Sequence, residues 1–392
     1  MINTFVKVLI NMININSKLP SSKESIFSIM SRMAVENNAI NLSQGFPGFD
    51  IDGELIDLVS KYMKMGFNQY APMAGVPDLR KAISKMHLAS NGYEYNWENE
   101  ITITAGATQG LFTSISTLIE EGDEVIIFEP AYDSYVPDIQ LAGGKPIYIT
   151  LEYPNYQINW EDVNKRISSK TKMIILNNPH NPTGSVLDDD DLKELSKIVK
   201  GSNIIILSDE VYQHIIFDQK KHCSVANYPE LIERSIIVGS FGKSLHATGW
   251  KIGYLLAPKA ITKAIRSVHQ WVVYAVNTPI QHAIAEYISK PDIYSGVSVL
   301  LQEKRDLFLE LMKNSRFKAI PSKGTYFQLM DYSDISDKND IEFTEWLAKD
   351  KKVAAIPVSV FFHEKKDNKV IRFCFAKDNE ELEAAAKLLC DI

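Results

Sequence analysis

The sequence predicts an α/β fold in which helices cover both faces of a mostly parallel sheet. Between residues 101 and 238, six short runs rich in β-branched residues alternate with helical or loop segments, which is typical of successive β–α–β units. Beyond residue 317 the pattern changes to shorter strands with helices between and after them, which indicates α+β structure. We therefore expect a large domain followed by a smaller one.

Each expected element rests on a local pattern. The strands expected in the large domain are 101–104, 124–128, 146–151, 173–176, 204–207 and 236–238. Helical periodicity is found at 77–89, at 111–118, through much of 258–290 and at 297–311. In the smaller domain the expected strands are 325–330, 353–356 and 370–375, and the expected helices are 342–348 and 379–389. The four aspartates 188–191 are expected to cap the next helix rather than to bind a metal.

The change in the pattern of strands and helices divides the chain into three expected segments. Residues 1–45 are expected to pack with the small domain, 46–294 to form the large domain, and 295–392 to form the small C-terminal domain. The apolar residues at helical spacing in the first segment are Ile26, Phe27, Met30 and Met33.

Composition and charge exclude several classes of protein. Of the 392 residues, 45% are hydrophobic and 23% are charged, which is typical of a globular chain. The formal charge of −7 gives no basic surface for nucleic acid. Cys223, Cys374 and Cys390 are too few and too scattered for a disulfide framework or a thiolate metal site. We therefore expect a cytoplasmic protein without a bound metal.

The N-terminal residues give no targeting signal. Lys7 interrupts the short apolar run 5–10, and no small-residue cleavage site follows it, so no secretion signal is expected. No stretch approaches the roughly 20 apolar residues of a membrane-spanning helix. Met12 could be the true start of the protein.

Lys243 and Asp209 are expected at the same edge of the sheet. Lys243 follows the strand 236–238, and Asp209 ends the apolar run 204–207, so both should lie at the carboxyl ends of strands, where open α/β folds bind ligands. A single lysine there is more often a solvated loop residue, and Asp209 could equally cap a helix. Schiff-base chemistry on an amino acid needs such an amine and such a carboxylate.

Other segments offer the remaining groups for this chemistry. The turn 106–108 joins a strand to a helix, so its free N–H groups and the helix dipole suit an anion, although glycine turns of this kind are common. Asn181 lies between two prolines, so it can project from a rigid loop. Tyr212 follows Asp209 by three residues and could fall on the same side of its turn.

Four motifs, in this order along the chain, resemble those of the class I aminotransferases. They are Asn178-Pro179-His180-Asn181-Pro182-Thr183-Gly184, then Asp209-Glu210-Val211-Tyr212, then Ser240-Phe241-Gly242-Lys243 with Gly249-Trp250-Lys251-Ile252-Gly253, and then Ile371-Arg372-Phe373. The resemblance extends from about residue 18 to residue 392. It implies the type I fold of pyridoxal-phosphate enzymes, with the large domain holding the cofactor.

The resemblance also implies roles for single residues. Lys243 would form a Schiff base with pyridoxal phosphate, Asp209 would pair with its ring nitrogen, and Asn181 and Tyr212 would hold its phenolic oxygen. Tyr132 would stack on the ring. Lys243, Asp209 and Tyr212 would thus be the catalytic residues.

The implied phosphate-binding residues are Gly106, Ala107, Thr108, Ser240 and Lys251, together with Tyr70 from a neighbouring subunit. A homodimer with its sites at the interface would follow. Arg372 would bind the α-carboxylate of the substrate bidentately, aided by Asn181 and by the backbone at Gly45.

Two positions depart from the commonest family pattern. Lys251 stands where many members have arginine, so a point charge replaces a planar fork, and Gly242 stands where serine is more usual. Both features are similar to the subgroup that includes methionine and kynurenine/glutamine aminotransferases. The same holds for Gln44-Gly45-Phe46-Pro47, for His269-Gln270 and for Asn277-Thr278-Pro279.

The subgroup implies an apolar or thioether amino donor, with methionine first and aromatic amino acids and glutamine next. A dicarboxylate-specific member would need a second cation, and the segment 271–278 has none. The aromatic and apolar residues expected near the substrate are Trp271, Tyr274 and Val276, with Phe27, Phe46 and Phe362 from elsewhere in the chain. Plain core packing is at least as good an explanation of each.

The implied reaction is a ping-pong transfer of the amino group to a 2-oxo acid. A cysteine-conjugate β-lyase on the same cofactor and a kynurenine or aromatic aminotransferase remain open. A ligand-sensing module of a transcription regulator would need a DNA-binding domain, and the residues before Lys18 are too few and not basic enough.

Overall fold

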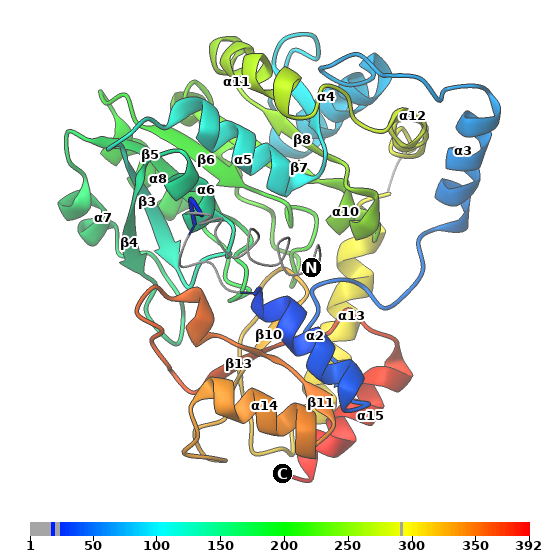
Figure 1. Cartoon of the computed structure of the whole chain (residues 1–392), viewed down its shortest axis with the longest axis vertical. Helices are drawn as coiled ribbons and strands as arrows, with labels where there is room; N and C mark the ends of the chain where they lie inside the picture. The colour runs from blue at the N-terminus through cyan, green and yellow to red at the C-terminus, as the bar shows by residue number, and fades with distance from the viewer. Residues whose placement is uncertain (1–16, 20–23, 291–292) are drawn as a thin grey trace, which may run out of the picture.

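The computed structural model describes residues 17–19, 24–290 and 293–392, so Met12 and the run 5–10 lie outside the described residues. A seven-stranded sheet with helices on both faces forms the larger part of the molecule, and a four-stranded sheet with its own helices lies beside it (Figure 1). Within the described ranges, no helix combines the length and apolar character needed to cross a membrane. The described residues also contain no cluster of three or more His, Cys, Asp or Glu side chains that could hold a metal ion.

The seven-stranded sheet confirms the predicted α/β class. Its strands are β2 (Ile101–Thr104), β3 (Glu124–Glu129), β4 (Lys145–Thr150), β5 (Thr171–Asn177), β6 (Ile205–Asp209), β7 (Ser235–Ser240) and β8 (Gly253–Leu256), in the order β2-β8-β7-β6-β5-β3-β4. Strands β3 to β7 pair in parallel, whereas β8 is antiparallel to both β2 and β7. The sequence prediction missed β8, because this four-residue strand coincides with the end of the Gly-Trp-Lys-x-Gly motif.

Alternating strand residues point to two apolar layers, which explains why helices cover both faces. Val125 and Ile127 pack with helices α5 (Ala107–Leu118), α6 (Tyr135–Leu141) and α11 (Lys259–Val272). Ile126 and Phe128 belong to the layer on the other face, with α4 (Pro77–Asn91), α8 (Asp189–Val199) and α12 (Thr278–Tyr287). Asp188 and Asp191 form the capping box of α8, so the aspartate run caps this helix as predicted.

The remaining helices of this part of the chain are short or lie at the surface. They are α3 (Gly53–Lys64), α7 (Trp160–Arg166), α9 (Pro229–Ile232) and α10 (Phe241–Ser244), with 3₁₀ turns η1 (Val225–Asn227) and η2 (Thr248–Trp250).

The four-stranded sheet is antiparallel. Its strands, in spatial order, are β12 (Ile356–Pro357), β13 (Val370–Cys374), β10 (Phe327–Asp331) and β9 (Lys318–Ile320). Helices α13 (Ser295–Met312), α14 (Asp340–Asp350) and α15 (Asn379–Cys390) accompany it, with the 3₁₀ turn η3 (Ser359–Phe361) between β12 and β13. Strands β10 and β13 and helices α13, α14 and α15 share a second apolar core.

The N-terminal segment packs against this second part. Helix α2 (Ile26–Glu36) contacts α14 and β11 (Val353–Ala354), and β1 (Ile40–Asn41) pairs in parallel with β11. Figure 1 shows α2 near α14. The domain boundaries at residues 46 and 295 stay a prediction.

The sheet brings four strand ends to one edge. Strands β3, β5, β6 and β7 are parallel and end at Glu129, Asn177, Asp209 and Ser240. In this register Asn177 lies opposite Asp209, and Asp209 lies opposite Val238. The residues that follow these strands therefore surround a common space.

Candidate active site

A cavity of about 260 Å³ opens at this edge of the seven-stranded sheet. Its walls come from several strand ends, from the start of α5, from α2 and from β10 and β13 of the four-stranded sheet. The lining residues predicted from the sequence are Gly45, Ala107, Thr108, Tyr132, Asn181, Asp209, Tyr212, Lys243 and Arg372.

Lys243 lies in α10, directly after β7, and its amine points to the middle of this set. Its Nζ donates to the hydroxyl of Tyr326 (2.8 Å) and to the carbonyl oxygen of Gly45 (3.3 Å). Burial, aided by the positive charge of Arg372, lowers the pKa of Lys243 to about 8. Roughly a tenth of the amine is therefore neutral and nucleophilic at pH 7, far more than for an ordinary lysine.

Asp209, at the end of β6, is a buried carboxylate. Its Oδ2 accepts a hydrogen bond from the hydroxyl of Tyr135 (2.7 Å), and its Oδ1 accepts the N–H of Val211 (3.3 Å). Burial raises the pKa of Asp209 to about 6, while the hydrogen bond from Tyr135 works in the opposite direction. The group is thus mostly ionised at pH 7 and can stabilise a positive charge in the cavity.

Arg372, in β13, is only 1% exposed although it is charged. It donates to Oδ1 of Asn181 (2.8 Å) and to the carbonyl oxygen of Ser43 (3.2 Å), and its guanidinium lies 3.9 Å from the ring centre of Phe327. Its Nε is buried, and no residue in the described part of the chain accepts a hydrogen bond from it. Burial lowers the pKa of Arg372 to about 10, so the side chain stays charged at neutral pH and is suited to bind a carboxylate.

The start of α5 forms the opposite end of the cavity. Gly106 has φ of +81°, which favours glycine, and its lack of a side chain leaves room for Lys251, whose Cε would lie 3.0 Å from a Cβ at this position. Lys251 and Thr108 are exposed, and the first N–H groups of α5 have no partners within the helix. A cation beside a helix N-terminus suits a phosphate.

Two tyrosines border the centre of the cavity. Tyr212 is buried, and burial raises its pKa well above the usual range, so its hydroxyl keeps its proton. Burial likewise raises the pKa of Tyr132 to about 12. Both hydroxyls can therefore donate hydrogen bonds at neutral pH.

Four predicted residues do not line the cavity. Three of them lie together just behind its open end: Gly106, Ser240 and Lys251. Ser240 pairs in the sheet with Gly253, which packs against the turn at Gly106, and the side chain of Lys251 crosses the same turn. Tyr70 is 81% exposed and packs edge to face on Tyr274 at 5.3 Å. The role expected for Tyr70 in a second subunit stays a prediction.

The sequence prediction missed three residues that contact the predicted groups. Tyr326 accepts from Lys243 and donates to the carbonyl oxygen of Gly45 (2.7 Å), and Tyr135 donates to Asp209. Gln44 lines the cavity and donates to the carbonyl oxygen of Phe27 (3.0 Å). Only Gln44 carried a sequence signal, because it belongs to the Gln-Gly-Phe-Pro segment of the resemblance.

The aromatic residues expected near the substrate are distributed differently. Phe27, on α2, lines the cavity. Phe46 is largely exposed, and Phe362 is buried in the core rather than at the cavity wall. Trp271 is 83% exposed, and Val276 is buried away from the cavity. Within one chain, therefore, the apolar wall consists of Phe27, Leu111, Val211 and Phe327.

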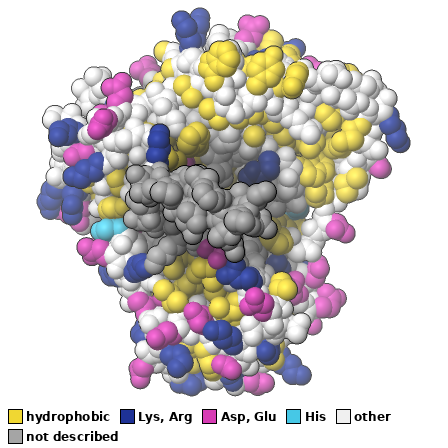
Figure 2. Space-filling model, in the orientation of Figure 1, with side chains coloured by type: hydrophobic (Ala, Val, Ile, Leu, Met, Phe, Trp, Pro, Cys, Tyr) yellow, Lys and Arg dark blue, Asp and Glu magenta, His cyan; other side chains and the backbone are white. Residues whose placement is uncertain are grey.

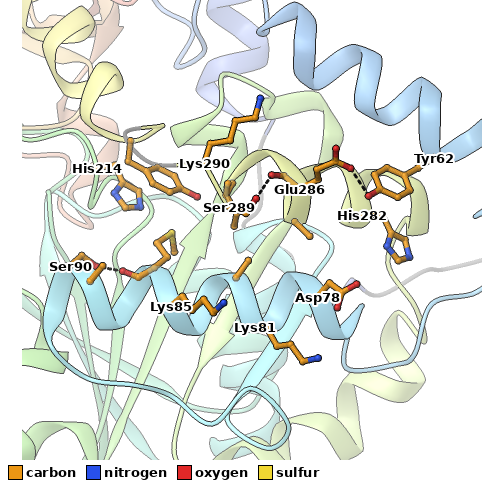
Figure 3. A pocket seen from close by; sticks show the side chains of 16 residues that line it. Tyr62, Asp78, Lys81, Lys85, Ser90, His214, His282, Glu286, Ser289 and Lys290 are labelled. Carbon is orange, nitrogen blue, oxygen red and sulfur yellow. Dashed lines mark hydrogen bonds between the residues drawn. The ribbon is translucent and has the colours of Figure 1, made fainter.

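A larger cavity of about 710 Å³ lies between α4 and α12 (Figure 3). None of the predicted site residues lines it. Its carboxylate Glu286 is already bonded to Tyr62 (2.6 Å) and to Lys61 (2.7 Å). The smaller cavity, where an amine of lowered pKa faces a buried carboxylate, is therefore the candidate active site.

Comparison with known proteins identifies the family of the chain. Residues 37–389 match the family model described as aminotransferase class I and II. The chain belongs to this aminotransferase family. Methionine aminotransferase of Escherichia coli K12 is 44% identical over 374 residues, which are 95% of this chain and 97% of the relative. Kynurenine–oxoglutarate transaminase of Dictyostelium discoideum is 35% identical, over 98% of this chain and 97% of the relative.

Solved structures show the same fold. An Escherichia coli protein, whose structure and reactivity identify a methionine aminotransferase function, superposes with a TM-score of 0.95 at 43% identity, over 97% of this chain and all of that one. An aspartate aminotransferase of Thermus thermophilus superposes with a TM-score of 0.89 at 26% identity, over 97% of this chain and all of that one. Since relatives named for different substrates share the fold, the fold alone does not set the substrate.

Proposed function

We propose that this aminotransferase uses pyridoxal phosphate and takes its amino group from apolar or thioether amino acids, with methionine first and aromatic amino acids and glutamine next. The observation that carries the proposal is the meeting of Lys243, Asp209 and Arg372 in one cavity. An amine that is partly neutral, a buried carboxylate and a buried guanidinium are what the chemistry of the family requires.

The residues present fit pyridoxal phosphate. The turn at Gly106, which a Cβ would fill, the N-terminus of α5 and the exposed Lys251 suit its phosphate, and Ser240 lies beside them. Asp209 suits the protonated ring nitrogen, and Asn181 with Tyr212 suits the phenolic oxygen. When bound, this cofactor supplies an aldehyde that bonds to an amine and a ring that draws electrons from the Cα of the amino acid.

The residues of the chain then have separate tasks. Arg372, oriented by Asn181, holds the α-carboxylate of the amino acid. With the cofactor bound, Lys243 Nζ would act as the general base that takes the proton from Cα, and its ammonium form would be the acid that delivers this proton to the carbon of the cofactor's aldehyde group. Tyr326 keeps that amine in place through its hydroxyl. Phe27 and Phe327 exclude water from this side of the cavity.

The lining of the cavity supports the choice of substrate. Among the lining residues, which all lie in the described part of the chain, the cations are Lys243 and Arg372, and both have tasks already. An acidic side chain would therefore lack a charged partner, whereas Leu111, Val211 and Phe327 suit a thioether or an aromatic ring. The names of the relatives, for methionine and for kynurenine, point the same way.

A homodimer is part of the proposal. Tyr70, Trp271 and Tyr274 are large aromatic residues with 81%, 83% and 54% exposure, which favours a partner surface over solvent. Figure 2 shows hydrophobic side chains gathered in the upper right part of the visible face, while acidic and basic side chains intermix below. Tyr70 would reach the phosphate in the second subunit. A cytoplasmic location, which the free thiols of Cys223, Cys374 and Cys390 favour, completes the proposal.

The test is a ranking of amino donors with one 2-oxo acid. We expect kcat/KM for methionine to exceed that for aspartate by at least about tenfold, because a buried carboxylate without a partner is costly. Equal values for the two donors would contradict the proposed substrate class. Pyruvate and ammonia released from a cysteine conjugate without a 2-oxo acid would indicate the β-lyase instead.

A further inference from the structure

A buried carboxylate joins the two sheets next to the active site. Glu129, the last residue of β3, is 2% exposed. Its Oε2 accepts the main-chain N–H of His363 (2.8 Å), and both carboxylate oxygens lie 3.0 Å from Nδ1 of the same histidine. Thr150 donates its hydroxyl to Oε1 (3.0 Å). The carboxylate of the larger sheet is thus bonded to the segment between β12 and β13 of the smaller sheet.

The histidine is fixed from a second direction. Its ring stacks on Tyr148 of β4, with centroids 4.0 Å apart and planes 7° apart. Two residues further along the chain, the N–H of Ala131 donates to the carbonyl oxygen of Phe361 (2.8 Å). Two main-chain N–H groups, one from each segment, therefore join the segments 129–131 and 361–363, one by donating to the carboxylate of Glu129 and the other by donating to a main-chain carbonyl.

Both segments continue directly into the walls of the active site. On the side of the larger sheet, Tyr132 follows Ala131 and lines the cavity. On the other side, the ring of Phe361 lies 5.8 Å from the guanidinium of Arg372 and 6.0 Å from the ring of Phe27. The contact between Glu129 and His363 therefore joins the segment that leads to Tyr132 with the segment whose Phe361 lies near Arg372.

We propose that Glu129 and His363 are positioning residues for the amino acid substrate. They touch neither the substrate nor the cofactor. They hold the segment of Phe361 against that of Tyr132, so that Arg372 and Phe27 face the reacting centre in the arrangement that binds the amino acid. Without this contact, the arrangement of Arg372 and Phe27 that binds the amino acid would be less populated, and the apparent affinity for the amino acid would fall in proportion. Loss of the contact should therefore raise KM more than it lowers kcat.

The test rests on the proposed function and uses the holoenzyme with methionine and a saturating 2-oxo acid. The side chain of His363 is 37% exposed, so His363→Ala is expected to fold. This variant should raise KM for methionine by about tenfold, because one charge-assisted hydrogen bond is lost. Its kcat should stay within about twofold of the wild-type value. His363→Asn, which places an amide donor near the position of Nδ1, should restore most of the affinity.

Tyr153→Phe is the matched control. Tyr153, just after β4, donates to Asp331 at the end of β10 (2.6 Å), so it also joins the two sheets, but neither residue lines the active-site cavity. Its KM should stay within about twofold of the wild type. An unchanged KM in His363→Ala, or an equal rise in Tyr153→Phe, would overturn the proposal.

Amide hydrogen exchange gives a readout that needs no turnover. In His363→Ala the N–H of Ala131 should exchange faster, because its acceptor at Phe361 is no longer held in place, whereas Tyr153→Phe should leave this amide protected. Unchanged protection in His363→Ala would also overturn the proposal. If the wild-type enzyme fails to use methionine, the proposed function fails, and the exchange experiment still decides whether the contact holds the two walls together.

Discussion

At one end of the cavity Arg372 is enclosed by groups from distant parts of the chain, whereas at and just behind the other end Thr108 and Lys251 are exposed to solvent. Asn181, Ser43 and Phe327 fix the guanidinium through two hydrogen bonds and a stacked ring. Lys251 and Thr108 are exposed, and the binding groups there are backbone N–H groups of α5. The enclosed end is suited to orient a small carboxylate, and the open end to hold a larger anion.

This difference predicts unequal tolerance to substitution. A buried charge in a low dielectric depends strongly on geometry, whereas an exposed charge is screened by water and salt. Substitution of Arg372 should therefore strongly reduce kcat/KM for the amino acid and leave the affinity for the cofactor unchanged. Substitution of Lys251 should weaken the affinity for the cofactor only slightly.

The largest effect is expected for Arg372→Lys. The ammonium cannot reproduce the planar fork, and Asn181 and the carbonyl of Ser43 lose their donors, so kcat/KM for methionine should fall by about 100-fold. The affinity for pyridoxal phosphate, measured by titration of the cofactor-free protein, should stay within about twofold. A variant that loses cofactor affinity as strongly as turnover would remove the distinction between the two ends.

A smaller effect is expected from pH, through Lys243 between the two ends. Only the neutral amine attacks an aldehyde, and burial lowers its pKa to about 8, so the neutral fraction grows as pH rises, reaches about half at pH 8 and saturates above about pH 9. The rate of cofactor capture by cofactor-free protein should rise about tenfold from pH 6 to pH 7 and level off above about pH 9. A rate that still rises tenfold between pH 9 and pH 10 would show that the lysine is not desolvated.

The smallest effect is expected for Lys251→Gln. Since the charge is exposed and the backbone of α5 remains, the dissociation constant for pyridoxal phosphate should rise by less than about fivefold, and added salt should shrink the difference. Lys251→Arg serves as the charge-preserving control. A loss above about 100-fold, independent of salt, would mean that this end is as enclosed as the other.

The same division explains what the sequence could predict. Lys243 and Asp209 each end or follow an apolar strand, and parallel strands place such residues at one edge, so local patterns sufficed. The turn at Gly106 was predictable for the same reason. These groups belong to consecutive β–α–β units, whose geometry varies little.

Other parts of the site depend on contacts between distant segments. Tyr326 meets Lys243 across 83 residues, and nothing in Gly324-Thr325-Tyr326 indicates that approach. Tyr135 looks like an ordinary helix residue, although its hydroxyl bonds to Asp209. The antiparallel β8 was missed because its four residues begin at the end of the Gly-Trp-Lys-x-Gly motif. Arg372 was predicted only through the family resemblance, since its burial depends on Asn181 and Ser43.

The most direct test of the central claim, that Lys243 is the amine on which transamination rests, is a visible absorption spectrum. Purified protein with pyridoxal phosphate is measured before and after methionine is added without any 2-oxo acid. We predict a yellow absorption band that methionine removes in the wild type, and a change at least about 100-fold slower in Lys243→Ala. The absence of a band after pyridoxal phosphate is supplied, or an equally fast change in Lys243→Ala, would contradict the account.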